Sequence, residues 1–251
     1  MNTTRYAQLM TVAMVISRLV PYYIIQDAFE FSNSNLDIGF FTSLFKNNDL
    51  FLLLYCLPPI MGILTIFKSA LLKPTAIAWI FSSLFLLWHQ YSYNDATHVV
   101  TFWSGIFTLW LLYHPAEKSN TSIIARLLLI MTLCGGVTGK LTPGYLNGEI
   151  LYEIYFISRD FWSYNLLRSL FHHQQLPEVA LVYSRIILAI ECTGILLAFI
   201  NHRIVFPLIA TLFLAIAVVN NWFLFSVVTC PIAIATIGFL ISKTPKQIYH
   251  S

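Results

Sequence analysis

The chain has 251 residues, of which 58% are hydrophobic and only 10% are charged. Soluble domains carry roughly 25% charged residues, so this composition, with a mean hydropathy of +0.73, predicts an integral membrane protein. The net charge of +3 is small, and no basic cluster of the kind that binds nucleic acid is visible. We expect one membrane domain over residues 1–251. Its predicted fold is all-α, a polytopic transmembrane helix bundle with about 7–8 membrane segments of ~20 residues each.

Apolar runs predict the positions of the membrane helices. The run at 203–219 is short for a full crossing, so residues 203–242 form either two crossings or one crossing and a re-entrant segment. After the fifth helix, residues 141–178 mix aromatic and charged side chains, which predicts an amphipathic segment on the outer face. The predicted helices cover residues 6–26, 49–67, 74–92, 98–114, 122–140, 179–200, 203–219 and 222–242.

The charged residues between these helices separate by sign when the N-terminus is placed inside. An excess of lysine and arginine marks the cytoplasmic side of a membrane, so the pattern predicts a multi-pass protein of the cytoplasmic (inner) membrane with both termini inside. The loops at 27–48, 93–97 and 141–178 are then outside. The inner bases are Arg5, Lys68, Lys73, Lys118, Arg126, Arg203, Lys243 and Lys246, beside one acid, Glu117. The outer acids are Asp27, Glu30, Asp37, Asp49, Asp95, Glu149, Glu153, Asp160 and Glu178, beside the bases Lys46, Arg159 and Arg168.

Four further charged residues fall within predicted helices or at their ends: Arg18, Lys140, Arg185 and Glu191. Ionisable groups inside a membrane are costly unless they are paired or hydrated, and they are candidates for a functional site by default. Two interpretations stay open. The four residues are functional groups, or Glu191 forms a structural ion pair with Arg18 or Arg185 that holds helices together.

The fifth predicted helix ends in the sequence CGGVTGKL, which places Lys140 directly after a glycine-rich turn. Gly135, Gly136 and Gly139 remove side-chain bulk, so another backbone or a flat ligand can approach the helix closely. The following TPGYLNGE, which contains Tyr145, predicts a turn, and EILYEIYF predicts a short amphipathic segment. Lys140 is therefore expected where a cavity opens toward the outer face.

These residues carry a family resemblance. LLLIMTLCGGVTGKLTPGYLNGEILYEIYF resembles the signature of the horizontally transferred transmembrane domain family, in which a helix ending in small-Gly-x-x-Lys-Leu precedes a loop and an apolar-aromatic helix. The same pattern occurs in the vitamin K-dependent γ-glutamyl carboxylases and, more loosely, in DoxX-like and MauE-like membrane proteins. Arg18 in VISRLVPYY, the polar turn YSYNDATHVVTFW and Glu191 in ILAIECTGILLAFI match in order. The specific part of the resemblance is the segment 134–156.

The resemblance implies a catalytic role for Lys140, which would deprotonate a reduced quinone of the vitamin K type, with His98 assisting. Burial or a nearby cation is what allows a lysine to act as a base. The sequence FPLIATLFLAIAVVNNW lacks the histidine that the family commonly shows in its penultimate helix, so peptide carboxylation is not expected to be carried over intact. The residues expected to bind the cofactor are Gly135, Gly136, Gly139, Arg18 and Tyr145.

Two functions remain open at this point. The chain is a carboxylase-like or quinone-linked membrane enzyme that takes a hydrophobic small molecule from the bilayer, or a non-enzymatic assembly, maturation or immunity factor with a membrane or peptide partner. A small transporter is disfavoured, because the charges within the helices cluster toward the outer side and transport requires a polar path through both leaflets. The seven histidines show no metal-ligand spacing. The four cysteines form no C-x-x-C motif, and no metal site is expected.

Overall fold

The computed structural model of the chain describes residues 3–19, 48–89, 95–157, 161–220 and 224–242. Within these ranges the chain forms helices and turns and no strand, which confirms the all-α prediction for the described residues. A short 3-10 turn, η2 (Ser69–Leu71), joins the second and third long helices. The long helices are α1 (Thr3–Leu19), α4 (Asn48–Phe67), α5 (Leu72–His89), α6 (Asp95–Tyr113), α7 (Lys118–Lys140), α11 (Leu176–Phe199), α12 (Val205–Asn220) and α13 (Leu224–Ser242).

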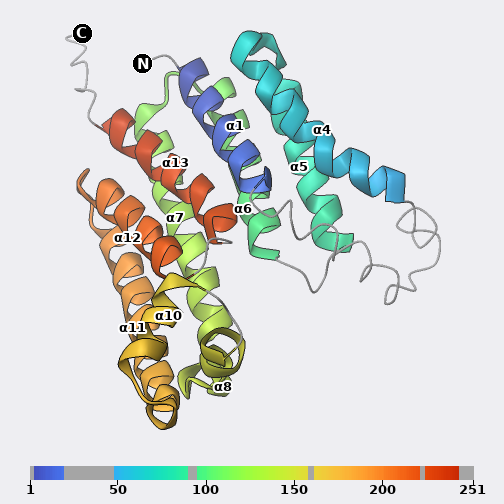
Figure 1. The fold of residues 1–251 in the computed structure, drawn as a ribbon. Coiled ribbons are helices and arrows are strands. Elements are labelled where there is room, and N and C mark those ends of the chain that lie inside the picture. Colours follow the sequence, from blue (N-terminus) through green and yellow to red (C-terminus); the bar gives the residue numbers. More distant parts are fainter. Residues whose placement is uncertain (1–2, 20–47, 90–94, 158–160, 221–223, 243–251) are drawn as a thin grey trace.

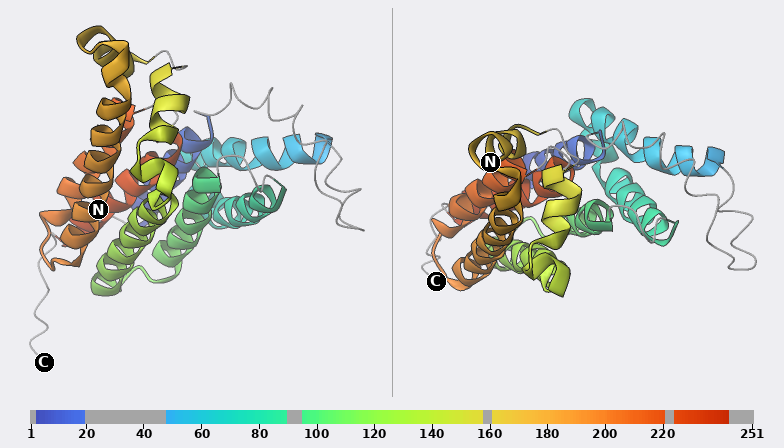
Figure 2. Two further views of the ribbon diagram at one scale, coloured as in Figure 1. Left: turned by 90° about the horizontal axis from the view of Figure 1, so that it is seen from below. Right: turned by 60° about the horizontal axis from the view of Figure 1, so that its bottom comes forward.

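The long helices pack into one bundle with α1, α6, α7 and α13 in the middle (Figure 1). α4 and α5 lie together on one side, and α11 and α12 lie on the other, in both Figure 1 and Figure 2. α13 contacts α1, α6, α7 and α12. Its side chains Cys230, Ile234 and Ile237 are accordingly buried in the main hydrophobic core of the bundle.

Five described helices are long and apolar enough to cross a membrane. Two further apolar helices, Leu53–Phe67 and Val205–Asn220, are shorter. Large apolar side chains remain on the outside of the bundle, as at Phe81, Leu196 and Phe199, whose exposed fractions are 66%, 69% and 68%. Such a surface suits lipid and not water, so the structure fits a multi-pass membrane protein. The five spans are Ser69–Leu87, Ala96–Tyr113, Lys118–Lys140, His173–Phe199 and Leu224–Ser242.

A helix is present at each of the eight predicted stretches, with ends that differ by a few residues where both ends are described. The predicted count of 7–8 membrane segments is larger than the five helices that satisfy the length and hydropathy requirements. Residues 203–242 form two helices, α12 and α13, that pack against each other. Several predictions fall outside the described residues: the end of the first helix at 20–26, the outer loop at 27–47, Arg159, Asp160, Lys243 and Lys246.

Polar side chains inside the helices bond to the preceding turn of their own helix. Along the buried face of α6, Thr101 donates to the carbonyl of Thr97 at 2.9 Å, and Ser104 donates to the carbonyl of Val100 at 2.7 Å. A bilayer offers no water to a buried hydroxyl, so each must find its acceptor within the protein. These bonds to the residue four positions earlier give each of the two hydroxyls an acceptor within its own helix.

Short helices form a cap over one end of the bundle (Figure 1). The cap corresponds to the predicted outer amphipathic region, and its buried side chains pack on the first turns of α11. Its elements are α8 (Pro143–Leu146), α9 (Glu149–Leu151), the π-helical turn η3 (Tyr152–Ile157), α10 (Trp162–Leu170) and η4 (His173–Gln175). Its core consists of Tyr145, Leu151, Phe156, Phe161, Tyr164, Leu176 and Ala180.

The cap closes the end of α12, which at 16 residues is a short helix. It spans about 24 Å at 1.5 Å per residue, less than the ~30 Å hydrocarbon thickness of a bilayer. Its last carbonyls would lack partners within the helix. Trp162 Nε1 donates to the carbonyl of Val218 at 2.8 Å, and Ser163 Oγ donates to the carbonyl of Val219 at 2.5 Å. These two side chains of α10 therefore donate hydrogen bonds to carbonyls at the end of α12 that have no donor within the helix.

The outward face of α10 is apolar. Trp162, Leu166 and Leu170 are 48%, 50% and 66% exposed, and their spacing of four residues places them on one side of the helix. The opposite side is buried through Ser163 and Tyr164. A short helix with one face on the protein and an apolar stripe facing outward fits the membrane interface.

Gly148 fixes the position of the cap against α11. Its φ of +79° lies in the left-handed region, and a Cβ atom there would stand 2.5 Å from the backbone nitrogen of Leu181. Only glycine accepts both the conformation and the contact at low cost. The turn within TPGYLNGE therefore docks directly on the α11 backbone.

We predict that Gly148→Ala destabilises the protein, because the new methyl group is strained at its own backbone and collides with Leu181. Backbone strain of this kind costs roughly 1–3 kcal/mol, and the collision adds to it. Thermal unfolding in detergent measures the effect. Gly135→Ala is the matched control, since its Cβ meets nothing within 4 Å, and it should leave the midpoint unchanged or raised. Equal midpoints for the two variants would show that the cap does not depend on this contact.

Candidate functional site

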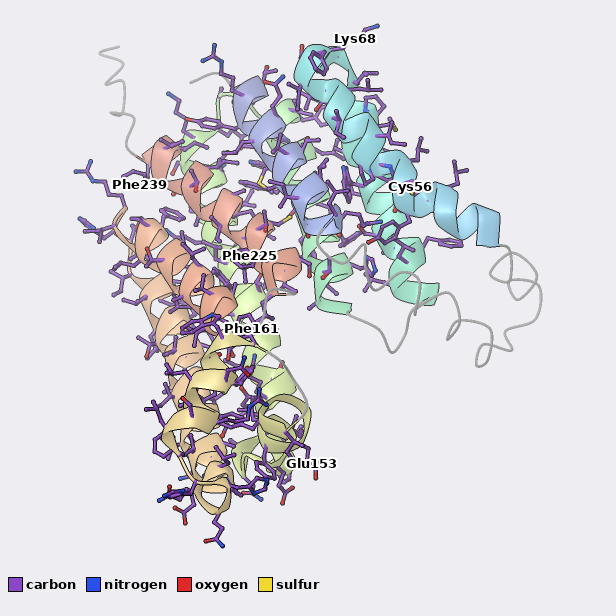
Figure 3. All side chains as sticks on the ribbon, in the orientation of Figure 1. Cys56, Lys68, Glu153, Phe161, Phe225 and Phe239 are labelled. Atoms are coloured by element: carbon purple, nitrogen blue, oxygen red, sulfur yellow. The ribbon has the colours of Figure 1, made fainter. Side chains whose placement is uncertain are left out.

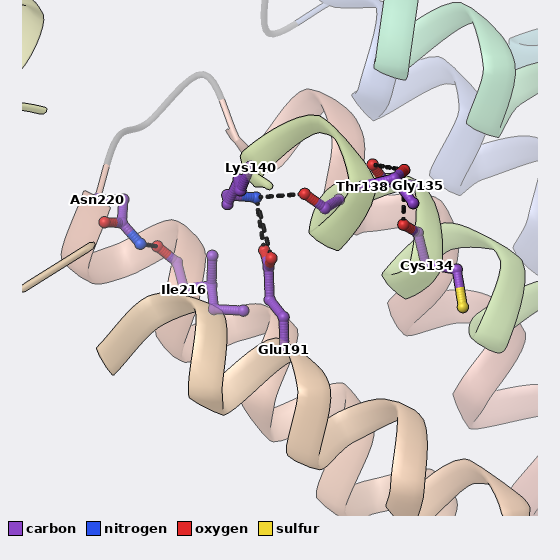
Figure 4. A network of polar contacts seen from close by, with 8 residues as sticks. Cys134, Gly135, Thr138, Lys140, Glu191, Ile216 and Asn220 are labelled. Carbon is purple, nitrogen blue, oxygen red and sulfur yellow. Dashed lines mark hydrogen bonds and ion pairs between the residues drawn. The ribbon is translucent and has the colours of Figure 1, made fainter. Parts of the chain in front are cut away.

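Lys140 and Glu191 form an ion pair between α7 and α11 (Figure 4). Lys140 is the last residue of α7, and its ammonium donates to Glu191 Oε1 at 2.8 Å and to Oε2 at 3.0 Å. The same nitrogen lies 3.2 Å from the carbonyl oxygen of Gly136, one turn earlier on α7. An ammonium has three hydrogens, so the three oxygens provide one acceptor for each.

The two side chains differ in burial. The Glu191 side chain is 8% exposed, whereas 26% of the Lys140 side chain is exposed. A carboxylate at such a position is costly without a partner, and Lys140 is the partner that the fold supplies. The more exposed end of the pair is therefore the amine, which is the group that a molecule from outside the bundle can reach.

The glycines before Lys140 have separate roles in the structure. A Cβ at Gly136 would stand 3.4 Å from Glu191 Oε1, so the absence of a side chain gives the carboxylate its place against α7. A Cβ at Gly135 or Gly139 would meet no other described part of the chain within 4 Å. The predicted glycine set thus divides into one residue that contacts the ion pair and two that leave an open helix face beside it.

Arg18 and Arg185 are the predicted partners of Glu191. In the structure Glu191 pairs with Lys140 instead. Arg185 is exposed and lies six residues before Glu191 on α11, a separation that puts the two side chains on different faces at 3.6 residues per turn. Arg18 belongs to α1, which packs on α4, α5, α6 and α13, whereas α11 packs on α7 and α12. The prediction identified the ionisable residues but could not determine which helices are neighbours.

Arg18 is fully buried at the end of α1, with 0% exposure. Its Nη1 donates to Ser82 Oγ at 3.3 Å, and its backbone carbonyl accepts from the hydroxyl of Tyr55 at 2.9 Å. The guanidinium carbon lies 4.8 Å from the ring centroids of both Tyr55 and Trp79. Among the described residues the cation is thus held by aromatic faces, and no carboxylate forms an ion pair with it.

His98 is buried near the beginning of α6, within electrostatic reach of Arg18. Its neighbour Thr97 shares a 2.8 Å hydrogen bond with the hydroxyl of Ser226 on α13, and Ser17 donates to the carbonyl of the same serine. The structure therefore brings His98 and Arg18 into one buried polar cluster between α1, α6 and α13. Lys140 and Glu191 form the other ionic centre, on α7 and α11.

The remaining predicted site residue, Tyr145, lies in the buried core of the cap. Tyr55, Trp79 and Ser82, which contact Arg18, are not among the site residues predicted from the sequence. Nothing in their local sequence distinguishes them from the many aromatic and hydroxyl residues of a membrane helix. Only the packing of α4 and α5 on α1 identifies them.

Within the described part of the chain, no three His, Cys, Asp or Glu side chains lie close enough together to hold a metal ion. Comparison with known proteins gives no further assignment. No family model, no curated protein and no solved structure matches this chain.

We predict that Glu191→Gln lowers the free energy of unfolding, because it leaves the Lys140 ammonium without a carboxylate. Removing one partner of a fully buried pair costs roughly 3–5 kcal/mol, and the loss here should be smaller, about 1–3 kcal/mol, since Lys140 is partly exposed. Glu178→Gln, an exposed position on the same helix, is the control. Unfolding in detergent that responds equally to the two substitutions would contradict a stabilising ion pair.

Proposed function

We propose that the protein is a membrane enzyme of the quinone-linked kind, in which Lys140 and Glu191 exchange protons with a hydrophobic molecule that enters from the bilayer. The observation that carries the proposal is the ion pair itself, with a buried carboxylate and a partly exposed amine at the end of a membrane helix. Ionisable residues in such positions are functional candidates by default. The resemblance of the Lys140 segment to carboxylase-like membrane proteins favours quinol chemistry over other reactions.

A proton transfer within the pair would convert the Lys140 ammonium into a neutral amine, which can act as a base. The ammonium proton passes across the 2.8 Å contact to Glu191, which leaves a neutral amine and a neutral carboxyl group. A low-dielectric site favours neutral groups over separated charges. The lone pair on Lys140 Nζ then accepts a proton from an acidic hydroxyl group, and Glu191 holds the first proton until the pair is restored.

A quinol would supply, when bound, the acidic hydroxyl group whose proton Lys140 accepts. The residues beside Lys140 leave room for a flat ring, because no other part of the described chain stands within 4 Å of the Cβ positions of Gly135 and Gly139. Gly139 directly precedes Lys140, so this open face adjoins the amine along the helix. Arg18 and His98 form a second buried polar cluster, for which we propose a supporting role in binding the same molecule.

A second function has its own support. The three hydrogens of the Lys140 ammonium already have three acceptors, as in a purely structural pair. Gly135 and Gly139 are spaced four residues apart on an open face, and small residues at this spacing allow membrane helices to associate closely. A non-enzymatic protein that docks a helix of a membrane partner on α7 is therefore the alternative.

We further propose a cytoplasmic-membrane location with about seven or eight crossings and both termini inside. Glu149, Glu153 and Glu178 belong to the cap region at one end of α7 and α11, whereas Lys118 and Arg126 lie near the other end of α7. Figure 3 places Lys68 and Glu153 at opposite ends of the molecule. The basic end is cytoplasmic if the usual bias of lysine and arginine holds.

The enzyme proposal predicts that Lys140→Arg removes bound quinone while the protein remains folded. Arginine keeps the charge and the ion pair, but its guanidinium does not release a proton at accessible pH and is wider than an ammonium. The measurement is the ultraviolet spectrum of an organic extract from protein purified in mild detergent. Turnover of a short-chain naphthoquinol by the same samples provides the second readout.

Lys68→Arg is the control for this experiment, because Lys68 is exposed in the connection between α4 and α5. Wild-type protein and Lys68→Arg should contain quinone and consume naphthoquinol, and Lys140→Arg should do neither. A wild-type extract free of quinone, together with a co-purifying polypeptide, would refute the enzyme proposal in favour of the docking alternative. Full turnover by Lys140→Arg would exclude Lys140 as a base.

The orientation predicts which positions a membrane-impermeant thiol reagent reaches in intact cells. With the four native cysteines replaced by alanine, Glu153→Cys should react from outside. Ser119→Cys should react only after permeabilisation. Both positions are exposed in the structure, so burial does not explain a difference between them. The reverse labelling pattern would overturn the proposed topology.

A further inference from the structure

A basic pocket lies at the opposite end of α7 from Lys140. It has a volume of about 580 Å³ and is bounded by the first turns of α7, the connection between α11 and α12, and the end of α13. On α7 the pocket extends from Lys118 to Arg126, so about 21 Å of helix separates its nearest residue from Lys140. The residues that line it are Lys118, Ser119, Ser122, Ile123, Arg126, Asn201, His202, Arg203, Ile241 and Ser242.

The charge of the pocket is positive and uncompensated. Lys118, Arg126 and Arg203 contribute three cations, and no residue in the lining is acidic. Within the described ranges, none of the three forms an ion pair. Side chains of this kind, with the serine hydroxyls and the Asn201 amide as further donors, are the groups that bind a phosphate.

The nearest acid, Glu117, is engaged outside the pocket. Its carboxylate lies 2.8 Å from Asn120 Nδ2 and 3.0 Å from His114 Nδ1. Hydrogen bonds from Asn120 and from His114 hold the pKa of Glu117 below its usual value. The carboxylate is therefore ionised at neutral pH and occupied by these two partners, and it does not neutralise Lys118 or Arg126 by direct contact.

Arg126 is fixed in place by the protein. One guanidinium nitrogen donates to the carbonyl of Ile200 at 2.8 Å, and the guanidinium carbon lies 5.2 Å from the Phe206 ring centroid. A guanidinium has five N–H donors, so most remain available after this single bond. An arginine held in one orientation loses less conformational entropy when it binds an anion.

The backbone at this end has mixed polarity. α7 begins at Lys118 and α12 begins at Val205, and helix N-termini attract anions. The end of α13 also reaches the pocket, through Ile241 and Ser242, and its dipole has the opposite sign. The side-chain cations therefore decide the preference of the pocket for a negative ligand.

An apolar surface continues from the pocket along α7. Ile123 lines the pocket and is 53% exposed, and Leu127, one turn further into the helix, is 52% exposed. A soluble anion would gain nothing from this surface. A phospholipid would place its phosphate among the cations of the pocket and its acyl chains against Ile123 and Leu127. It would therefore use both the charged and the apolar part of this surface.

We propose that this pocket binds the phosphate of an anionic phospholipid. The proposal concerns a separate end of the molecule and is independent of the quinone chemistry at Lys140. Basic pockets between membrane helices recognise anionic headgroups through the same combination of charge and concave shape. The bound lipid would join α7, α12 and α13 at this end of the bundle.

Native mass spectrometry of the detergent-purified protein, titrated with phosphatidylglycerol or with phosphatidylcholine, tests the proposal. The wild type should retain phosphatidylglycerol in preference to phosphatidylcholine. The pocket variant Lys118→Gln with Arg203→Gln should lose roughly thirtyfold in affinity for phosphatidylglycerol, at about fivefold per cation. Both residues are exposed, so the variant should fold.

The control variant, Arg5→Gln with Lys68→Gln, removes one arginine and one lysine from exposed positions outside the pocket lining. It should retain phosphatidylglycerol nearly as the wild type does. Equal losses in the two variants would mean that net charge and not the pocket holds the lipid, and would overturn the proposal. Displacement of phosphatidylglycerol by millimolar inorganic phosphate would also overturn it, since the site would then belong to a soluble anion.

Discussion

The hydrocarbon of a bilayer offers no hydrogen-bond partner, and most features of this structure follow from that constraint. Backbone groups are satisfied within helices, and the hydroxyls of Thr101 and Ser104 on α6 bond to the preceding turn. At the end of the short helix α12, Trp162 and Ser163 donate hydrogen bonds to carbonyls that have no donor within the helix. The cap therefore completes the hydrogen bonding of the bundle, and its apolar face on α10 stays outward.

The same constraint gives two different solutions for buried charge. Glu191 is a compact anion that needs donors, and it receives them from Lys140 across a position that Gly136 leaves free. Arg18 carries a delocalised charge that aromatic faces can stabilise, and it lies between Tyr55 and Trp79. The first arrangement joins two side chains that are both titratable, whereas the second fixes a permanent cation. This difference is why the proposed proton chemistry centres on Lys140.

The two ends of the bundle present different chemistry to their surroundings. The cap end combines a partly exposed amine, an open glycine face and a helix with a lipid-facing stripe. The other end combines three cations in the pocket lining with an apolar edge on α7. α7 extends through both, from Lys118 to Lys140. A molecule dissolved in the bilayer and a lipid headgroup would thus meet the protein at separate places on one helix.

The sequence alone determined where the helices lie, because long apolar runs and the cost of placing charge in lipid leave few alternatives. It also marked Lys140, Glu191 and Arg18, since each is an ionisable group inside an apolar helix. The choice of Lys140 as the partner of Glu191 depended on which helices are neighbours. Packing decides this through many weak contacts that no local pattern encodes. The basic pocket was hidden for the same reason: residues 118–126, 201–203 and 241–242 are distant in the chain and meet only after α7, α12 and α13 pack.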